Sequence, residues 1–476
     1  MDVDRIAAVL AGIVGQNRVL TDPLVLREFS RDETENDPGN AEIVVKPVST
    51  AQVQDVVRLA AAEGIPLIPV VARTNLGGLG IPTRGGIVVD LNDMEAAEID
   101  PVSMHAIIEP GVTFGKMAKL LEAQAPELTV SYALSPPEAS VLANCILDGL
   151  GNLSLPHGTM ADQIAGLEVV MPDGEIVRTG SCAVISSSWV SRAPMPDLTG
   201  LFVNWQGTTG IVTKVSVCLW PVRPLRLRRF IPTFDLGASY GLLRDLARTG
   251  LFDDLGGLTW PASKMLFGVG RPLHRDPDEP EFFIYTDMSA HDEFEMEAKS
   301  RVVARVIASH RGRLAMEDPL GVEDLTSLAP SFARFANFPM TLDFLTEFEG
   351  RGLTWIGTYG PTGAWEEASA KGSALMVKHG FPPMLVIRPM KGGHFGVLRF
   401  ITAFYRDDPQ EVERVKAMNA EVLEVCLDTG FIPYKTPAWV FERLRKQMDP
   451  GYLRLLEQVK GLIDPAGIMN PGRFGF

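Results

Sequence analysis

The feature that most constrains this chain is a glycine-rich loop at residues 73–80, Arg-Thr-Asn-Leu-Gly-Gly-Leu-Gly. It directly follows residues 66–70, a short apolar run that predicts a buried strand. Closely spaced glycines after a strand let backbone N–H groups point the same way, and no Cβ obstructs a ligand. The loop therefore predicts a phosphate-binding turn, although a plain surface turn stays open from the loop alone. It is not a Rossmann fingerprint, because no G-x-G-x-x-G opens a helix there, and it is not a P-loop, because no Gly-Lys-Ser/Thr occurs.

Composition narrows the class of protein further. The 476 residues are enough for two or three domains, and the formal charge of −15 argues against nucleic acid or an anionic membrane as partner. The four cysteines lie far apart without C-x-x-C spacing, which predicts buried thiols and no metal site. No basic segment precedes a long apolar core at the N-terminus, so we expect a cytoplasmic protein, with separate export to the periplasm left open.

The order of elements in the first half predicts an α+β domain on a mixed sheet. Four short apolar runs read as strands, and a helix begins near Ser49 or Thr50 and ends at Gly64. The predicted strands are 43–47, 66–70, 86–91 and 105–109.

From about residue 225 the pattern changes to longer elements. Predicted strands cover 282–286, 353–358, 384–388 and 395–404, predicted helices cover 292–309, 365–379 and 409–427, and a loop-rich stretch lies around 318–350. Two β-α-β units with an antiparallel return are typical of a ferredoxin-like arrangement.

Eight segments in order resemble the FAD-linked oxidoreductases of the vanillyl-alcohol oxidase and p-cresol methylhydroxylase family. The resemblance covers most of the chain and includes Glu-Pro-Gly-Val-Thr at 109–113 and Gly-Leu-Glu-Val-Val-Met-Pro-Asp-Gly-Glu at 166–175. The other six segments are 45–62, 73–80, 88–94, 139–144, 207–213 and 470–473. It implies a two-domain α+β fold of the p-cresol methylhydroxylase type. The FAD-binding domain would cover residues 1–225 and be completed by 450–476, with a ferredoxin-like cap at 226–449.

The resemblance also implies which residues hold FAD. Small and polar side chains along the flavin allow close approach and hydrogen bonds to its polar edge, although Ser140 and Asn144 could equally bond only to backbone. The implied cofactor-binding residues are Val71, Ala72, Arg73, Thr74, Asn75, Leu76, Gly77, Gly78, Pro110, Gly111, Pro136, Ser140, Val141, Asn144, His157, Gly158, Asp162, Gly210, Ile211, Val212 and Arg473.

Two candidate catalytic residues come from the segments that face the flavin in the family. Thr159 occupies the place at which the aryl-alcohol branch has an acid, so Asp162 is the candidate to replace it. His394, in Gly-Gly-His-Phe-Gly, falls near the segment that carries covalent flavin attachment, and either attachment or proton transfer would suit a histidine. A structural histidine is the alternative at this position.

Tyr434 and Lys435 fall where the p-cresol branch has a Tyr-Arg pair that binds and helps ionise a phenol. Lysine keeps the positive charge but loses the bidentate fork of arginine. A core tyrosine beside a solvated lysine is the alternative. Trp355 and Tyr359 resemble the strand that closes over the substrate, although alternating aromatic residues are often core.

The resemblance thus implies an FAD-dependent enzyme that takes a hydride from a benzylic or alpha carbon of a small phenolic substrate, a 4-alkylphenol or an aryl alcohol. Electrons would pass to oxygen or to a separate cytochrome c-type subunit, because this chain has no C-x-x-C-H haem motif. We expect a homodimer or a hetero-oligomer, and covalent attachment of FAD stays open. The alternatives are a 2-hydroxy-acid dehydrogenase of the lactate or glycolate type and a flavin-binding subunit without turnover.

Overall fold

Two small sheets form the first part of the computed structural model, which describes residues 1–193, 195–340, 345 and 351–476. The first sheet has the order β1 (Val19–Leu20), β2 (Ile43–Val45), β4 (Ile87–Asp90) and β3 (Leu67–Val70), with β2, β4 and β3 parallel. Helices α1 (Val3–Val14) and α3 (Thr50–Glu63) pack apolar side chains against it. As predicted, Ser49 caps α3 by accepting a hydrogen bond from the Gln52 N–H, and Gly64 ends the helix in the left-handed region.

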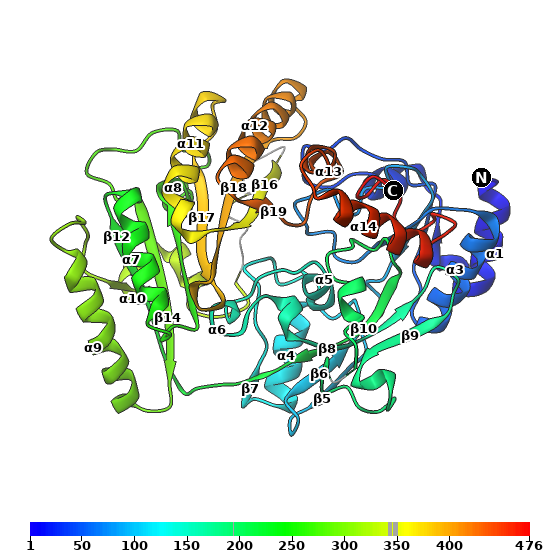
Figure 1. Cartoon of the computed structure of the whole chain (residues 1–476), viewed down its shortest axis with the longest axis horizontal. Helices are drawn as coiled ribbons and strands as arrows, with labels where there is room; N and C mark the ends of the chain where they lie inside the picture. The colour runs from blue at the N-terminus through cyan, green and yellow to red at the C-terminus, as the bar shows by residue number, and fades with distance from the viewer. Residues whose placement is uncertain (194, 341–344, 346–350) are drawn as a thin grey trace.

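The second sheet is antiparallel and five-stranded. Its order is β5 (Ala97–Asp100), β6 (His105–Ile108), β10 (Ile211–Cys218), β8 (Ile164–Val170) and β9 (Ile176–Gly180). Helices α4 (Phe114–Gln124) and α5 (Val141–Ile146) pack against it, and β7 (Leu128–Thr129) pairs with β11 (Trp220–Pro221) nearby. The loops between these elements reach toward the other half of the molecule (Figure 1).

The second half of the chain is built on an eight-stranded antiparallel sheet. Its order is β15 (Leu320–Gly321), β12 (Leu225–Thr233), β14 (Phe282–Ala290), β13 (Asp254–Thr259), β17 (Met384–Met390), β18 (Phe395–Tyr405), β16 (Arg351–Gly360) and β19 (Ile432–Pro433). Each group of four follows the β-α-β-β-α-β pattern with spatial order 4-1-3-2, and the two groups join where β13 pairs with β17. The predicted ferredoxin-like arrangement is confirmed and occurs twice.

Four long helices cover one face of this sheet and bury the largest apolar core. They are α7 (Leu236–Arg248), α9 (Glu293–His310), α11 (Trp365–Lys378) and α12 (Pro409–Asp428), of which α12 also bonds to the first half through Lys416 to Asp37 and Asn419 to Glu35. The helices α8 (Trp260–Leu266) and α10 (Val322–Leu328) belong to the cluster on the opposite face. That opposite face is the one directed at the first half.

The chain returns to its first sheet at the end. After α13 (Ala438–Leu444) and α14 (Pro450–Ile463), the Asn470 N–H donates to the Leu67 carbonyl at 2.8 Å. Figure 1 shows this C-terminal segment beside the N-terminal elements. We keep the domain boundaries 1–225 with 450–476, and 226–449, as a proposal.

The remaining elements are short. They are α2 (Pro23–Phe29), α6 (Ser154–His157) and 3-10 helices at Gln16–Arg18, Met160–Gln163, Ser181–Ala183, Thr199–Leu201, Pro330–Phe335, Thr362–Ala364 and Lys391–Gly393. The stretch predicted to be loop-rich therefore contains β15, α10 and one 3-10 helix, while its residues 341–344 and 346–350 lie outside the described residues. In the described part of the chain, no helix is long and apolar enough to span a bilayer.

Candidate active site

A cavity of about 870 Å³ lies between the loops of the first half and the open face of the eight-stranded sheet. On one side its wall includes residues 69–76, 133–140 and 210–212. On the other side it is lined by side chains from β12, β14, β13, β17, β18 and β16, and by Lys435. Segments from both ends of the sequence therefore enclose one space.

The predicted phosphate loop forms part of this wall. The Asn75 side-chain oxygen accepts hydrogen bonds from the backbone N–H groups of Gly77 and Leu79, which closes the loop on itself. The N–H groups of Arg73, Thr74 and Leu76 have no acceptor among the described residues, although all three residues line the cavity. Backbone donors left without partners at a cavity wall fit the oxygens of a pyrophosphate.

Glycine is required in this loop because other segments approach it closely. A Cβ at Gly77 would overlap the carbonyl oxygen of Lys435, and Gly78 has a φ of +66°. The buried Arg473 guanidinium donates to the Gly78 carbonyl at 2.5 Å and to the Ile81 carbonyl at 3.1 Å. Gly77, Gly78 and Arg473 thus determine the shape of the loop but do not line the cavity.

The structure brings most of the other predicted cofactor residues to the cavity. Those that line it are Val71, Ala72, Pro136, Ser140, Asn144, Gly210, Ile211 and Val212. Pro110, Gly111 and Val141 do not line it. The Pro110 carbonyl instead accepts the Ser140 hydroxyl at 2.6 Å, so this turn positions Ser140 at the start of α5.

His157, Gly158 and Asp162 lie away from the main cavity. The His157 ring stacks on Trp220 with centroids 3.4 Å apart. The Asp162 side chain pairs with Lys391 at 3.2 Å and caps a 3-10 helix through the Thr159 N–H. It lines a separate cavity of about 340 Å³.

His394 is also not brought to either cavity wall, and its side chain is exposed. The turn before it contains three consecutive residues with positive φ, from Lys391 to Gly393. The structure therefore separates His394 from the other candidate catalytic residues, Tyr434 and Lys435.

Tyr434 is 7% exposed and lies in a cluster of aromatic and basic side chains. Its hydroxyl accepts a hydrogen bond from Arg399 Nε at 2.8 Å, and its ring stacks on Tyr359 with centroids 4.3 Å apart. The Arg399 guanidinium also lies 4.6 Å from the centre of the Trp355 ring. Burial raises the pKa of Tyr434, whereas the nearby Arg399 charge opposes that rise.

Lys435 is the lysine at the cavity wall. Its Nζ donates to the Asn144 side-chain oxygen at 3.3 Å, which joins the end of β19 to α5. Burial, followed by the charge of Arg399, lowers the pKa of Lys435 to about 8. Among the described residues no carboxylate pairs with Arg399 or Lys435, so the two cations leave an anion-binding region in the cavity.

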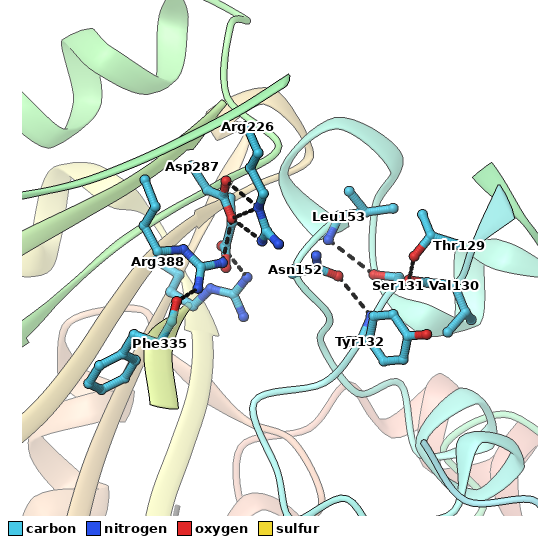
Figure 2. Close-up of polar contacts among 12 residues, drawn as sticks. Thr129, Val130, Ser131, Tyr132, Asn152, Leu153, Arg226, Asp287, Phe335 and Arg388 are labelled. Carbon is cyan, nitrogen blue, oxygen red and sulfur yellow. Dashed lines mark hydrogen bonds and ion pairs between the residues drawn. The ribbon is translucent and has the colours of Figure 1, made fainter. Parts of the chain in front are cut away.

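Sequence reasoning missed three polar residues around this cluster. Arg399 and Arg388 line the cavity, and Arg388 Nη2 donates to Asp254 at 2.7 Å and to the Gly151 carbonyl at 2.8 Å. Figure 2 shows Arg388 near Asp287, on the side of the sheet facing the loop that carries Asn152. An arginine inside an apolar strand was the available signal, because a buried charge needs a partner or a ligand.

Asp148 is the third missed residue. Its carboxylate accepts a hydrogen bond from the Thr159 hydroxyl, and its carbonyl accepts one from the Tyr359 hydroxyl at 2.6 Å. Burial raises the pKa of Asp148. It contributes to the smaller cavity and can hold a proton there, close to the position at which an acid was predicted.

A loop with open backbone donors and a cap sheet over one cavity are typical of an enzyme that binds a phosphate-bearing cofactor. Residues 41–180 match the model for the FAD binding domain, and residues 367–474 match that for the C-terminal domain of FAD linked oxidases.

The chain is similar to several known proteins over nearly its whole length. It is 24% identical to the 4-cresol dehydrogenase [hydroxylating] flavoprotein subunit of Pseudomonas putida, covering 97% of this chain and 94% of that protein. It is 23% identical to the mitochondrial D-lactate dehydrogenase [cytochrome] of Arabidopsis thaliana, covering 91% and 73%. The crystal structure of p-cresol methylhydroxylase with substrate bound superposes with a TM-score of 0.88 at 20% identity, covering 99% and 96%.

The chain therefore carries the FAD binding domain and the C-terminal domain of the FAD linked oxidases, and it has the fold of p-cresol methylhydroxylase. It is an FAD-dependent oxidase or dehydrogenase that acts on CH–OH or CH groups. The predicted fold class and cofactor are confirmed.

Proposed function

We propose that this enzyme oxidises a small phenolic substrate, a 4-alkylphenol or an aryl alcohol, at its benzylic or alpha carbon. The observation that carries the proposal is the cluster of Tyr434, Arg399 and Lys435, in which Arg399 and Lys435 line the cavity and the Tyr434 hydroxyl is bound to Arg399. A phenol bound there would meet a tyrosine hydroxyl and two cations, which favour its ionised form. A phenolate pushes electrons toward the benzylic carbon and so eases hydride loss.

The chain's own residues bind and orient both molecules. The N–H groups of Arg73, Thr74 and Leu76 would hold the pyrophosphate of FAD, and Ser140 with Asn144 would lie along its flavin. When bound, FAD supplies the hydride acceptor. Trp355 and the apolar side chains around it exclude water from the substrate.

The direct roles fall to two side chains. Tyr434, oriented by Arg399, would hold the phenol oxygen through its hydroxyl. Lys435 would add a positive charge that stabilises the phenolate. Asp162 and His394 keep no role in this proposal, because Asp162 pairs with Lys391 beside the smaller cavity and His394 is exposed.

Electrons would leave the enzyme for oxygen or for a cytochrome c-type subunit. The name of the Pseudomonas relative, a flavoprotein subunit, supports a separate acceptor within a hetero-oligomer. A homodimer that uses oxygen is the alternative. Oxygen consumption by the purified chain, measured with and without an added cytochrome c, separates the two.

A 2-hydroxy-acid dehydrogenase is the second candidate function. The guanidinium groups of Arg388 and Arg399 in the cavity favour it, because arginine is suited to binding carboxylates. The D-lactate dehydrogenase relative and the glycolate oxidase subunit GlcD of Bacillus subtilis, 24% identical, support the same chemistry.

Anaerobic flavin reduction decides between the two functions. We expect 4-alkylphenols to bleach the flavin absorbance within seconds, whereas D-lactate and glycolate leave it unchanged. Bleaching by the hydroxy acids alone would overturn the proposal and establish the second candidate.

A further inference from the structure

We propose that Arg388 and Tyr285 form a second anion-binding subsite, so that the substrate is a phenol that also carries a carboxylate. The inference rests on the proposed function for the placement of the phenol at Tyr434 and Lys435. It adds a second point of recognition on different strands of the cap sheet.

Arg388 has donors that the protein leaves unused. The residue is 1% exposed and lines the cavity, yet its Nε and Nη1 atoms have no hydrogen-bond partner among the described residues. Nη2 alone binds Asp254 and the Gly151 carbonyl. A buried guanidinium without partners for two nitrogens costs free energy unless a ligand supplies the acceptors.

Tyr285 supplies a further unused donor. Its hydroxyl is buried without a partner among the described residues, and the residue lines the same cavity. Burial raises its pKa, so the hydroxyl stays protonated and can donate. Gly256 lies opposite Tyr285, and a Cβ there would crowd both the Tyr285 hydroxyl and the Arg388 side chain. The missing side chain lets these two groups approach each other across β13.

The charges around this pair favour an anion. Three guanidinium groups meet two carboxylates on this part of the sheet face: Arg226 and Arg228 pair with Asp287, and Arg388 pairs with Asp254. Figure 2 shows Arg226 and Asp287 in contact, with Arg388 close by. One positive charge is therefore left without a carboxylate in this group, and a ligand carboxylate would balance it.

The subsite neighbours the Tyr434 cluster but lies on different strands. Strands β18 and β16 lie between β17, which carries Arg388, and β19, which leads to Tyr434. Adjacent strands are about 4.8 Å apart, so the backbones of β17 and β19 lie roughly 14 Å apart. Because the side chains extend over the sheet, this separation suits one aromatic ring with a short acidic tail.

The test compares two ligands that differ only in the tail. 3-(4-Hydroxyphenyl)propanoate and its primary amide share the phenol, but only the acid has a carboxylate. Dissociation constants are measured anaerobically from the perturbation of the flavin spectrum, and reduction rates are measured in the same mixtures. We expect the native holoenzyme to bind the acid at least tenfold more tightly than the amide.

Three variants test which residues cause the preference for the acid over the amide. In Arg388→Met/Asp254→Asn, which removes the pair without leaving a lone buried charge, the acid-to-amide affinity ratio should fall close to one. Tyr285→Phe should lower the ratio about threefold to tenfold and serves alone if the double variant does not fold. Arg301→Met is the control, because Arg301 lies on α9 with a 70% exposed side chain away from the cavity wall, and it should keep the native ratio.

Different results would overturn the anion-binding subsite and the proposed function. Equal affinity for acid and amide in the native enzyme, or an unchanged ratio in both Tyr285→Phe and the double variant, overturns the subsite. If neither compound reduces the flavin while the acid still binds more tightly through Arg388, the proposed function fails and the subsite stands.

Discussion

Gly77 in the phosphate loop lies directly against the backbone carbonyl of Lys435, so that a Cβ at Gly77 would overlap that oxygen. The two residues belong to segments far apart in the sequence, one near the proposed pyrophosphate and one beside the proposed substrate. The contact couples the position of Lys435 to the loop that holds FAD.

Substitution of Gly77 should therefore affect both ligands. We expect Gly77→Ala to lower the FAD content of the purified protein and to weaken phenol binding in the fraction that keeps FAD. Flavin absorbance per chain and ligand titration measure the two effects. Gly12→Ala is the control, since Gly12 lies in α1 with no atom within 4 Å of its Cβ position, and alanine there should be neutral or mildly stabilising. Full FAD content in Gly77→Ala would contradict the proposed coupling.

The Tyr434 hydroxyl should matter for the rate. Tyr434→Phe removes the group that Arg399 orients and leaves the ring stacked on Tyr359. Since a hydrogen bond to a charged group contributes about 1.5–3 kcal/mol, the rate of flavin reduction by a 4-alkylphenol should fall about tenfold to a hundredfold. Stopped-flow absorbance measures it. Tyr452→Phe, at a tyrosine that is 55% exposed, should match the native rate.

Lys435 should make phenol binding depend on pH. Its pKa of about 8 means that it loses its positive charge as pH rises through that value, and affinity for an anionic ligand should fall there. Titrations from pH 6.5 to 9.5 should show the decline in the native enzyme and a flatter profile in Lys435→Met. Identical profiles would remove Lys435 from the site.

The lowered pKa of Lys435 also predicts how the free energy of unfolding changes with pH. The folded pKa lies below the ordinary value of 10.5, so the unfolded chain binds more protons between about pH 8 and 10.5. The contribution of Lys435 to the free energy of unfolding therefore rises with pH in this window. Below pH 8 the buried charge is destabilising, and Lys435→Met should unfold at a higher denaturant concentration than the native protein.

The position of His394 predicts how FAD is held. Because its side chain is exposed and away from the main cavity, we expect acid precipitation to release the yellow chromophore into the supernatant. A yellow pellet would show a covalent link instead, and repeating the treatment on His394→Ala would then identify the attachment residue.

Local patterns predicted the elements well where caps and periodicity agree. The helices predicted at 292–309 and 409–427 occur at Glu293–His310 and Pro409–Asp428, with Asp292 and Asp408 as N-caps. The loop at 73–80 was found because its glycines are adjacent in sequence.

The sequence could not predict which strands pair when they lie far apart in the chain. Arg388 reaches Asp254 because β17 pairs with β13, which lies more than 120 residues earlier, and alternation along a strand does not reveal which face meets a cavity. His394 was chosen for its neighbourhood in the chain, but positive φ angles at 391–393 accompany a turn that leaves it exposed. Neighbourhood in the chain therefore did not predict whether His394 reaches the cavity wall.

The contact between Arg473 and the phosphate loop sets an order of events during synthesis. The Gly78 carbonyl is made 395 residues before the guanidinium that binds it, a delay of roughly 20–80 s at ordinary translation rates. Until Arg473 is made, its hydrogen bond to the phosphate loop cannot form. The loop proposed to hold the pyrophosphate of FAD therefore reaches its final shape only after Arg473 has been made.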